Sequence, residues 1–233
     1  MSTNGLNATA KANDTSNNIE NAHGPIKIPF AFPDESSKPP SVPEHDAEQE
    51  SKYKMLLEKV SLWTDVPIAS TRNASKSAIT DEERMWLTRE CLFRYLRATK
   101  WIVDEAERRL MATLVWRREY LLPEHDANYI SPENESGKQV IFGFDLNTAP
   151  CLYLFPGKQN SPRTERQVQH LVYMLERVID LMPPGQEALT LLITFANASS
   201  GTGSSVGQGK QVLYILQNHY PERLAKALIS EGA

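Results

Sequence analysis

The segment whose residue types come nearest to binding chemistry is "SSGTGSSVGQGK", residues 199–210. A phosphate-binding loop has the pattern G-x-x-x-x-G-K-[ST], in which backbone amides hold phosphates, the lysine neutralises charge and the final hydroxyl binds magnesium. Gly209 and Lys210 match, but Ser204 replaces the first glycine and Gln211 replaces the hydroxyl residue. Both mismatches fall on residues that the chemistry requires, so we predict a flexible surface loop here.

Histidine and cysteine suggest no catalytic or metal-binding constellation. The two cysteines, Cys91 and Cys151, lie in apolar runs and are expected to be reduced thiols in the core. No Cys/His cluster has zinc-binding spacing, and no G-x-S-x-G nucleophile elbow occurs. We therefore expect no enzymatic activity, no metal and no cofactor. The five histidines are scattered along the chain at His23, His45, His125, His170 and His219.

Composition restricts the class of protein. The 233 residues are 40% hydrophobic, which is enough for a core, and the formal net charge of −4 argues against nucleic acid as the main partner. The N-terminus lacks the apolar region of a signal peptide. No run approaches the roughly 20 apolar residues of a membrane-spanning helix.

The first 50 residues are predicted to be a disordered tail. They are rich in Asn, Ser and Pro, and they contain eight acidic and three basic residues. Such a segment cannot bury enough apolar surface to offset the conformational entropy that ordering would cost.

Three helices are predicted in the next part of the chain, residues 51–125. An amphipathic helix at 51–63 is followed by a linker at 64–78. Thr80 and Glu83 form a capping box that starts a second helix, and a third spans about 103–120. The apolar faces of the second and third helices consist of Met85, Leu92, Leu96, Ala106, Leu110 and Leu114.

Residues 126–233 instead alternate strands with helices. A long helix is expected to start at Ser161-Pro162, with serine as the cap, and another covers 210–219. The nearly uniform apolar run at 188–195 predicts a central strand covered on both faces. This order is typical of an α/β protein with a mainly parallel sheet. The expected strands are 138–145 and 151–155, which form a hairpin, 188–195 and 226–230.

Several stretches resemble the CRAL-TRIO lipid-binding family. "ECLFRYLRATKWIVDEAERRLMATLVWRREY" is similar to its N-terminal helical domain, whose hallmark is L-x-R-[FY]-L-R-A-x-K-[FW] followed by a helix ending in W-R. "RQVQHLVYMLERVIDLMPPGQEALTLLITF" and "QVLYILQNHYPERLAKALI" are similar to the first half of the lipid-binding domain. The resemblance is strongest to the fungal secretory-pathway type, the phosphatidylinositol transfer proteins, some of which also bind sterol.

The resemblance implies a function without chemistry. A three-helix N-terminal domain would pack on a mainly parallel sheet domain, and the protein would move phosphatidylinositol between membranes. The implied partners are phosphatidylinositol, sterol in some members, and a transient membrane surface. A cytoplasmic monomer, peripheral to membranes, would be expected.

Two lipid-headgroup residues follow from the motif match. Arg94 and Glu222 occupy positions that the family uses near the phosphoinositide headgroup. Arg94 would steady charged groups, and Glu222 would accept from inositol hydroxyls or hold a basic neighbour. The alternatives are that Arg94 only covers a helix surface and that Glu222 only lies in the first turn of a helix. Arg97 and Lys100 are interpreted as interdomain or solvated charges.

Departures from the family pattern set further expectations. Thr194 stands where the family usually places an aspartate after the central strand. The gate helix, further sheet and headgroup lysine that follow Y-P-E-R in the family do not follow it here, so the resemblance implies an incomplete lipid-binding domain. Such a chain is expected not to carry lipid. The alternative function is a regulatory or interaction fragment without lipid transfer, and co-purified lipid would separate the two.

Overall fold

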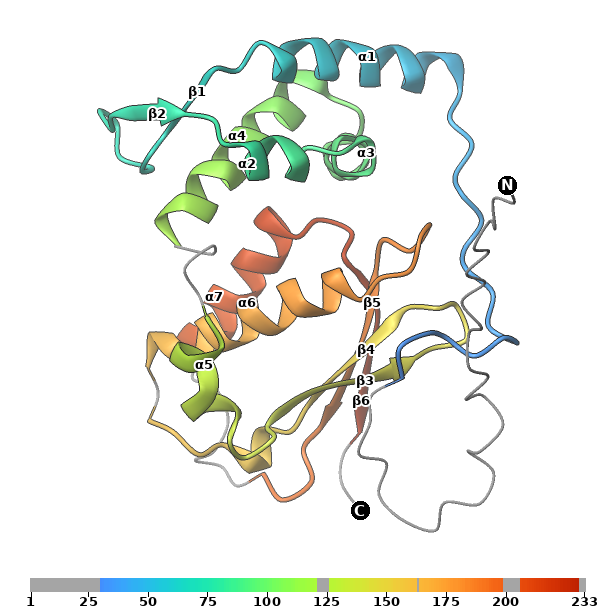
Figure 1. Ribbon diagram of the computed structural model, residues 1–233, viewed down its shortest axis with the longest axis vertical. Coiled ribbons are helices and arrows are strands. Elements are labelled where there is room, and N and C mark those ends of the chain that lie inside the picture. Colours follow the sequence, from blue (N-terminus) through green and yellow to red (C-terminus); the bar gives the residue numbers. More distant parts are fainter. Residues whose placement is uncertain (1–29, 121–125, 163, 199–205, 231–233) are drawn as a thin grey trace, which may run out of the picture.

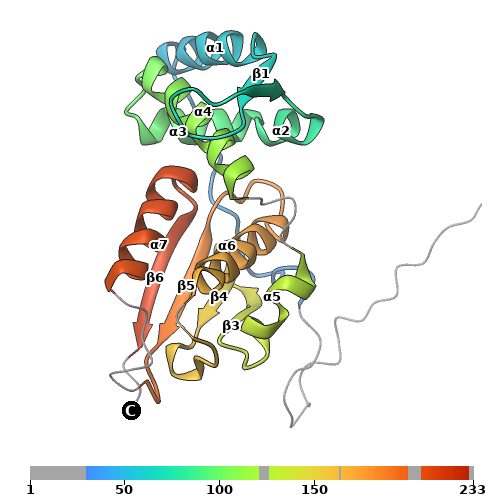
Figure 2. The ribbon, with the colours of Figure 1, turned by 90° about the vertical axis from the view of Figure 1, so that its left-hand side faces the viewer.

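The computed structural model describes residues 30–120, 126–162, 164–198 and 206–230, without the side chains of 206–208. A helical block lies above a sheet that is covered by helices on one face (Figures 1 and 2). Four helices make up the block, one more than predicted. They are α1 (Ala47–Ser61), α2 (Asp81–Trp86), α3 (Arg89–Ala98) and α4 (Val103–Glu119).

The predicted second helix is in fact two helices. Thr80 and Glu83 form the predicted capping box at the start of α2. The helix ends at Trp86, however, because Thr88 caps a new helix by accepting a hydrogen bond from the amide of Cys91 at 3.1 Å. The break turns α2 away from the core, so Met85 is 76% exposed instead of lying on the apolar face.

The predicted linker at 64–78 contains a small hairpin. β1 (Asp65–Pro67) pairs antiparallel with β2 (Lys76–Ala78). The Arg118 guanidinium of α4 donates to the carbonyl oxygens of Val66 at 2.7 Å and Ala78 at 2.9 Å. The linker prediction was wrong because these contacts come from a residue far along the chain, which no local pattern reveals.

The predicted disordered tail ends earlier than expected. Helix α1 begins at Ala47 behind an Asp46 capping box, and residues 30–46 have no helix or strand but contact the rest of the molecule. The Phe30 ring lies 5.2 Å from that of Phe142, and His45 stacks on Phe93 at 3.9 Å between centroids. Disorder is therefore wrong for residues 30–50, because aromatic side chains anchor the segment at both ends. Residues 1–29 lie outside the described part.

The sheet has the order β3-β4-β5-β6 and is mixed. The first pair is antiparallel and the other two are parallel, as the α/β prediction of a hairpin followed by parallel strands requires. The four strands are β3 (Gln139–Phe144), β4 (Pro150–Leu154), β5 (Leu189–Thr194) and β6 (Leu224–Ser230). Their helices are α5 (Ala127–Asn134), α6 (Glu165–Asp180) and α7 (Val206–His219).

Two local predictions in this part were wrong. Helix α5 was not predicted, since Pro132 within it argued against a helix. Helix α6 begins after Thr164 and not at Ser161, because the Ser161 hydroxyl donates instead to the buried carboxylate of Glu133 at 2.6 Å. Of the predicted surface loop, residues 199–205 lie outside the described part, and 206–210 belong to α7.

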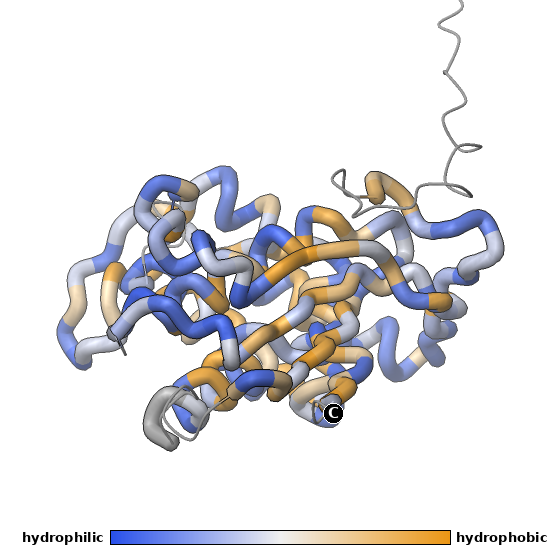
Figure 3. Tube along the Cα trace, turned by 90° about the horizontal axis from the view of Figure 1, so that it is seen from below, coloured by the Kyte–Doolittle hydropathy of each residue, from blue (hydrophilic) through white to orange (hydrophobic). Residues whose placement is uncertain are grey.

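Helices α6 and α7 cover only one face of the sheet. Leu152 and Leu189 point to that face and are buried in a core shared with Val172 and Ile215. Seen from below, hydrophobic stretches lie side by side across the sheet (Figure 3). Strand β5 is central, as predicted, but the expectation that it is covered on both faces was wrong, since its residues after Thr190 are only half-buried.

Candidate functional site

The uncovered face of the sheet carries a row of apolar side chains. Successive residues of a strand point to opposite faces, so the neighbours of the buried leucines point away from α6 and α7. The strand register places Val140, Tyr153, Leu192 and Leu228 next to one another in one row. Leu228 is 54% exposed. We call this row, with the adjoining Thr190 and Lys226, the open face.

A polar group lies at one end of the open face. Asp145 accepts hydrogen bonds from the Thr190 hydroxyl at 2.9 Å and from the Lys226 ammonium at 3.3 Å. Burial alone would raise the pKa of Asp145, but hydrogen bonds from Ala149, Thr190, Asn147 and Lys226 outweigh burial and lower it. The open face therefore combines an apolar row with a fixed charged pair, an arrangement that suits an amphipathic ligand.

The two predicted headgroup residues belong to one ion-pair network at the seam between the helical block and the sheet. Arg94 and Arg97 both donate to one oxygen of Glu187, each at 3.2 Å. Arg97 also donates to Glu222 at 2.5 Å, so it is an interdomain charge, as predicted. Lys100 is solvent-exposed. Glu187 and Arg97 thus connect the two predicted residues.

Local structure explains how these side chains meet. The i, i+3 spacing of Arg94 and Arg97 places them on one face of α3. Glu187 lies just before β5, and Glu222 lies in the turn between α7 and β6 with a positive φ of 58°. No helix begins at Glu222, so the alternative of a helix-start residue is wrong. Arg94 is only 5% exposed, so it does not simply cover a helix surface.

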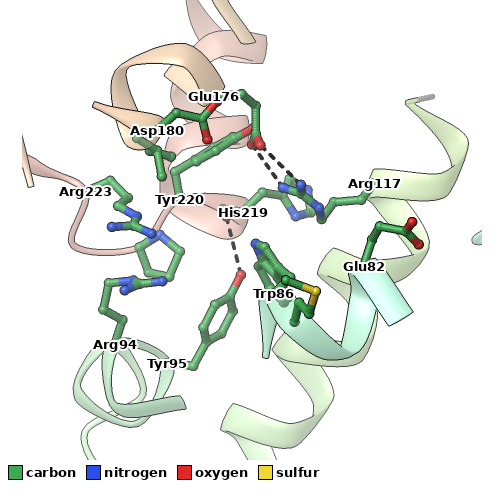
Figure 4. A pocket seen from close by; sticks show the side chains of 13 residues that line it. Glu82, Trp86, Arg94, Tyr95, Arg117, Glu176, Asp180, His219, Tyr220 and Arg223 are labelled. Atoms are coloured by element: carbon green, nitrogen blue, oxygen red, sulfur yellow. Dashed lines mark hydrogen bonds and ion pairs between the residues drawn. The ribbon is translucent and has the colours of Figure 1, made fainter. Parts of the chain in front are cut away.

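A pocket of about 350 Å³ lies at the same seam, beside helices α2, α3, α4 and α6 (Figure 4). Arg117 binds the carboxylate of Glu176 through two hydrogen bonds of 2.9 and 3.1 Å, and the Tyr220 hydroxyl donates to Glu176 at 2.6 Å. Burial would raise the pKa of Glu176, but Arg117 lowers it below its usual value. Burial also raises the pKa of Tyr220. Its further lining residues are Glu82, Met85, Trp86, Arg94, Tyr95, Ile179, Asp180, His219, Pro221 and Arg223.

Sequence reasoning missed Glu187, Arg223, Arg117 and Glu176 as members of the seam. Arg117 belongs to the W-R end of the helical hallmark, which was a usable signal. Glu187 and Glu176 carried no such signal, because their partners lie far away in the sequence.

The other chemistry-bearing residues form no second site. Cys91 and Cys151 are free and buried, as predicted. His170 is fully buried and neither of its ring nitrogens has a hydrogen-bond partner in the described structure. Within the described ranges no group of three or more His, Cys, Asp or Glu could hold a metal ion, and no helix is long and apolar enough to span a bilayer. Thr194, the departure from the family aspartate, ends β5.

Family models and relatives match the chain in a consistent order. The model of the CRAL/TRIO N-terminal domain matches residues 52–112, and that of the CRAL/TRIO domain matches residues 134–231. A CRAL-TRIO domain-containing protein of Schizosaccharomyces pombe is 46% identical over 209 residues, covering 88% of this chain and 20% of that protein. The phosphatidylinositol transfer protein PDR17 of Saccharomyces cerevisiae is 40% identical over 169 residues, covering 67% of this chain and 48% of PDR17.

The fold also has a solved counterpart. The crystal structure of Sfh5 superposes with a TM-score of 0.53 at 13% identity, over 80% of this chain and 72% of that one. At this identity the match shows the fold alone. The chain spans no more than about half the length of the two curated relatives. The two domain models in succession, together with relatives at 40% identity and above, show that the chain belongs to the CRAL-TRIO family.

Proposed function

We propose that the protein binds phosphatidylinositol and transfers it between membranes without changing it chemically, and that the open face is part of the lipid-binding wall. The observation that carries this proposal is an apolar row of four strands left uncovered in a CRAL-TRIO chain. The similarity to PDR17, a phosphatidylinositol transfer protein, supports the choice of lipid.

The physical requirement for transfer is burial of the acyl chains. A phospholipid exposes two chains of about sixteen carbons, and at ~0.8 kcal/mol per methylene their exposure to water would cost about 25 kcal/mol. A row of Val140, Tyr153, Leu192 and Leu228 offers apolar contact to such chains, and the sheet behind it is held rigid by α6 and α7.

Headgroup recognition is proposed for the exposed side of the seam. Glu222 has a side chain that is 38% exposed and can accept from inositol hydroxyls, while Arg97 beside it can donate to phosphate. Arg94 is buried behind them, so it would contribute through Glu187, which it shares with Arg97. Arg94 is therefore proposed as a positioning residue and Glu222 as a contact residue.

The test uses binding of a fluorescent phosphatidylinositol to the purified chain. Changing Leu192→Glu places a charge in the apolar row and is expected to abolish binding. The matched control is Leu213→Glu, which places the same charge on the half-exposed outer side of α7 and should leave binding unchanged. Equal binding by both variants would contradict the proposal and favour a docking role without lipid.

A second variant addresses the headgroup. Changing Glu222→Ala should weaken binding of phosphatidylinositol while leaving the melting temperature nearly unchanged, since the side chain is partly exposed. Unchanged binding with a lower melting temperature would mean that Glu222 only ties the domains together. A sterol added as competitor would show whether the same face also takes sterol.

A further inference from the structure

The pocket at the seam lies away from the open face. Glu176 and Ile179, which line it, belong to α6, and α6 packs on the covered face of the sheet. A lipid lying on the open face would have to cross the sheet to reach this pocket. Any ligand of the pocket is therefore a second ligand, distinct from the acyl chains proposed above.

Positive charge exceeds negative charge in the buried part of the seam. Arg117 and Glu176 balance each other. The remaining buried and half-buried groups are three guanidiniums, Arg94, Arg97 and Arg223, and the carboxylates of Glu187 and Glu222. Glu187 already serves both Arg94 and Arg97, and Glu222 serves Arg97. Within the described ranges, one positive charge of this set is left without a carboxylate.

Arg223 is the guanidinium without an acid. Its Nη1 donates to the backbone oxygen of Glu187 at 2.8 Å and to the sulfur of Met182 at 3.5 Å, both neutral acceptors. Figure 4 shows Arg223 and Arg94 on the same side of the pocket, coming from opposite sides of the seam. Burial, followed by the charge of Arg94, lowers the pKa of Arg223 to about 10, which indicates that the two guanidiniums repel each other.

We propose that Arg94 and Arg223 bind a phosphate-class anion in this pocket. Two guanidiniums offer several N–H donors in planar forks, the geometry that suits a phosphate group, and an anion between them would remove their repulsion. Trp86 and Ile179 line the same pocket and leave room for a small carbon skeleton, so the ligand class is a small phosphate ester.

The acids that line the pocket do not exclude this ligand. Glu82 is solvent-exposed, and Asp180 is exposed and paired with Arg177 at 3.0 Å. Charges in contact with water are screened, whereas Arg94 is almost fully buried. Since Arg94 belongs to α3 and Arg223 precedes β6, the bound anion would also join the helical block to the sheet.

Isothermal calorimetry with inorganic phosphate and glycerol phosphate, at constant ionic strength against chloride, tests the proposal. Arg223→Gln is expected to weaken binding at least about tenfold, because it removes charge and fork together. Arg177→Gln removes an exposed guanidinium next to the pocket and should bind as the unchanged protein does. Arg223→Lys, which keeps the charge but loses the fork, should bind with intermediate affinity.

Vesicles that contain phosphatidic acid form the second arm and distinguish a membrane source from a soluble one. Binding to either probe that depends on Arg223 supports the site and identifies its source. Binding that Arg223→Gln leaves unchanged, or no binding to either probe at millimolar concentration, overturns it. Binding of fluorescent phosphatidylinositol to the Arg223→Gln variant should persist, so failure of this site and failure of the open face can be told apart.

Discussion

Glu187 is the acidic residue on which the seam between the two parts depends. A single carboxylate oxygen accepts from Arg94 and from Arg97, and its backbone oxygen accepts from Arg223. Buried guanidiniums require a compensating charge, because leaving a buried charge unpaired costs more than the pair contributes. The seam therefore couples three arginines to one acid.

Changing Glu187→Gln should destabilise the protein by about 1–3 kcal/mol, since Arg94 then lacks its carboxylate while remaining buried. Urea unfolding gives the free energy. The control Glu105→Gln breaks a surface pair with Arg108 and should cause no measurable change. If the two variants unfold at the same urea concentration, the seam is not held by this charge.

Two buried histidines predict a dependence of stability on pH. Burial lowers the pKa of His170 and of His219 to about 4, with a further contribution from nearby positive charges. In the unfolded chain each titrates near 6.5, so between pH 6.5 and 4 only the unfolded state binds these protons. The free energy of unfolding should therefore be full above pH 6.5 and should fall as the pH approaches 4.

Urea unfolding at pH 7 and pH 5 measures this difference. The variant His170→Gln should show a smaller loss between the two pH values than the unchanged protein. The carboxylates of Asp145 and Glu176 have lowered pKa values and act at more acidic pH, outside this window. An identical loss in the variant would mean that His170 is not the titrating group.

Segment 30–46 is the element that joins the two parts from outside. Its ends are held by the Phe30–Phe142 and His45–Phe93 ring contacts, and the amide of Lys38 donates to the backbone oxygen of Leu146 at 3.0 Å. Asp46 then caps α1. The segment thus packs along the molecule without forming a helix or strand.

A pair of truncations tests this segment. A chain that starts at residue 30 should melt like the unchanged protein. A chain that starts at residue 47 should lose about 2–3 kcal/mol, the sum expected for two aromatic pairs and a helix cap. Calorimetric melting compares the two, and equal melting temperatures would show that residues 30–46 contribute nothing to the fold.

Elements with a strong local signal could be predicted from the sequence, and those set by distant contacts could not. Periodicity identified α4, and the alternating strand and helix pattern identified the sheet. The hairpin β1-β2 depends on Arg118, and the start of α6 depends on a serine that binds Glu133. For the candidate site, the motif pointed to Arg94 and Glu222, but Glu187 lies 93 residues from Arg94 and could not be assigned as its partner.

At the scale of the whole molecule, the sheet is covered on one side and open on the other. The covered side holds the core of α6 and α7, and the open face leaves Leu228 and Tyr153 in reach of a ligand. An open face contacts acyl chains from one side only. We therefore expect the 233-residue chain alone to bind phosphatidylinositol at a vesicle surface without carrying it through water.

Photocrosslinking tests the central claim, that lipid lies on the open face. Vesicles containing a phosphatidylinositol with a photoreactive acyl chain are irradiated with the protein, and the labelled residues are identified by mass spectrometry. The account predicts labels on Tyr153, Leu192 and Leu228, which the Leu192→Glu variant should lose. Labels concentrated on α6 and α7, or labelling that Leu192→Glu leaves unchanged, would contradict it.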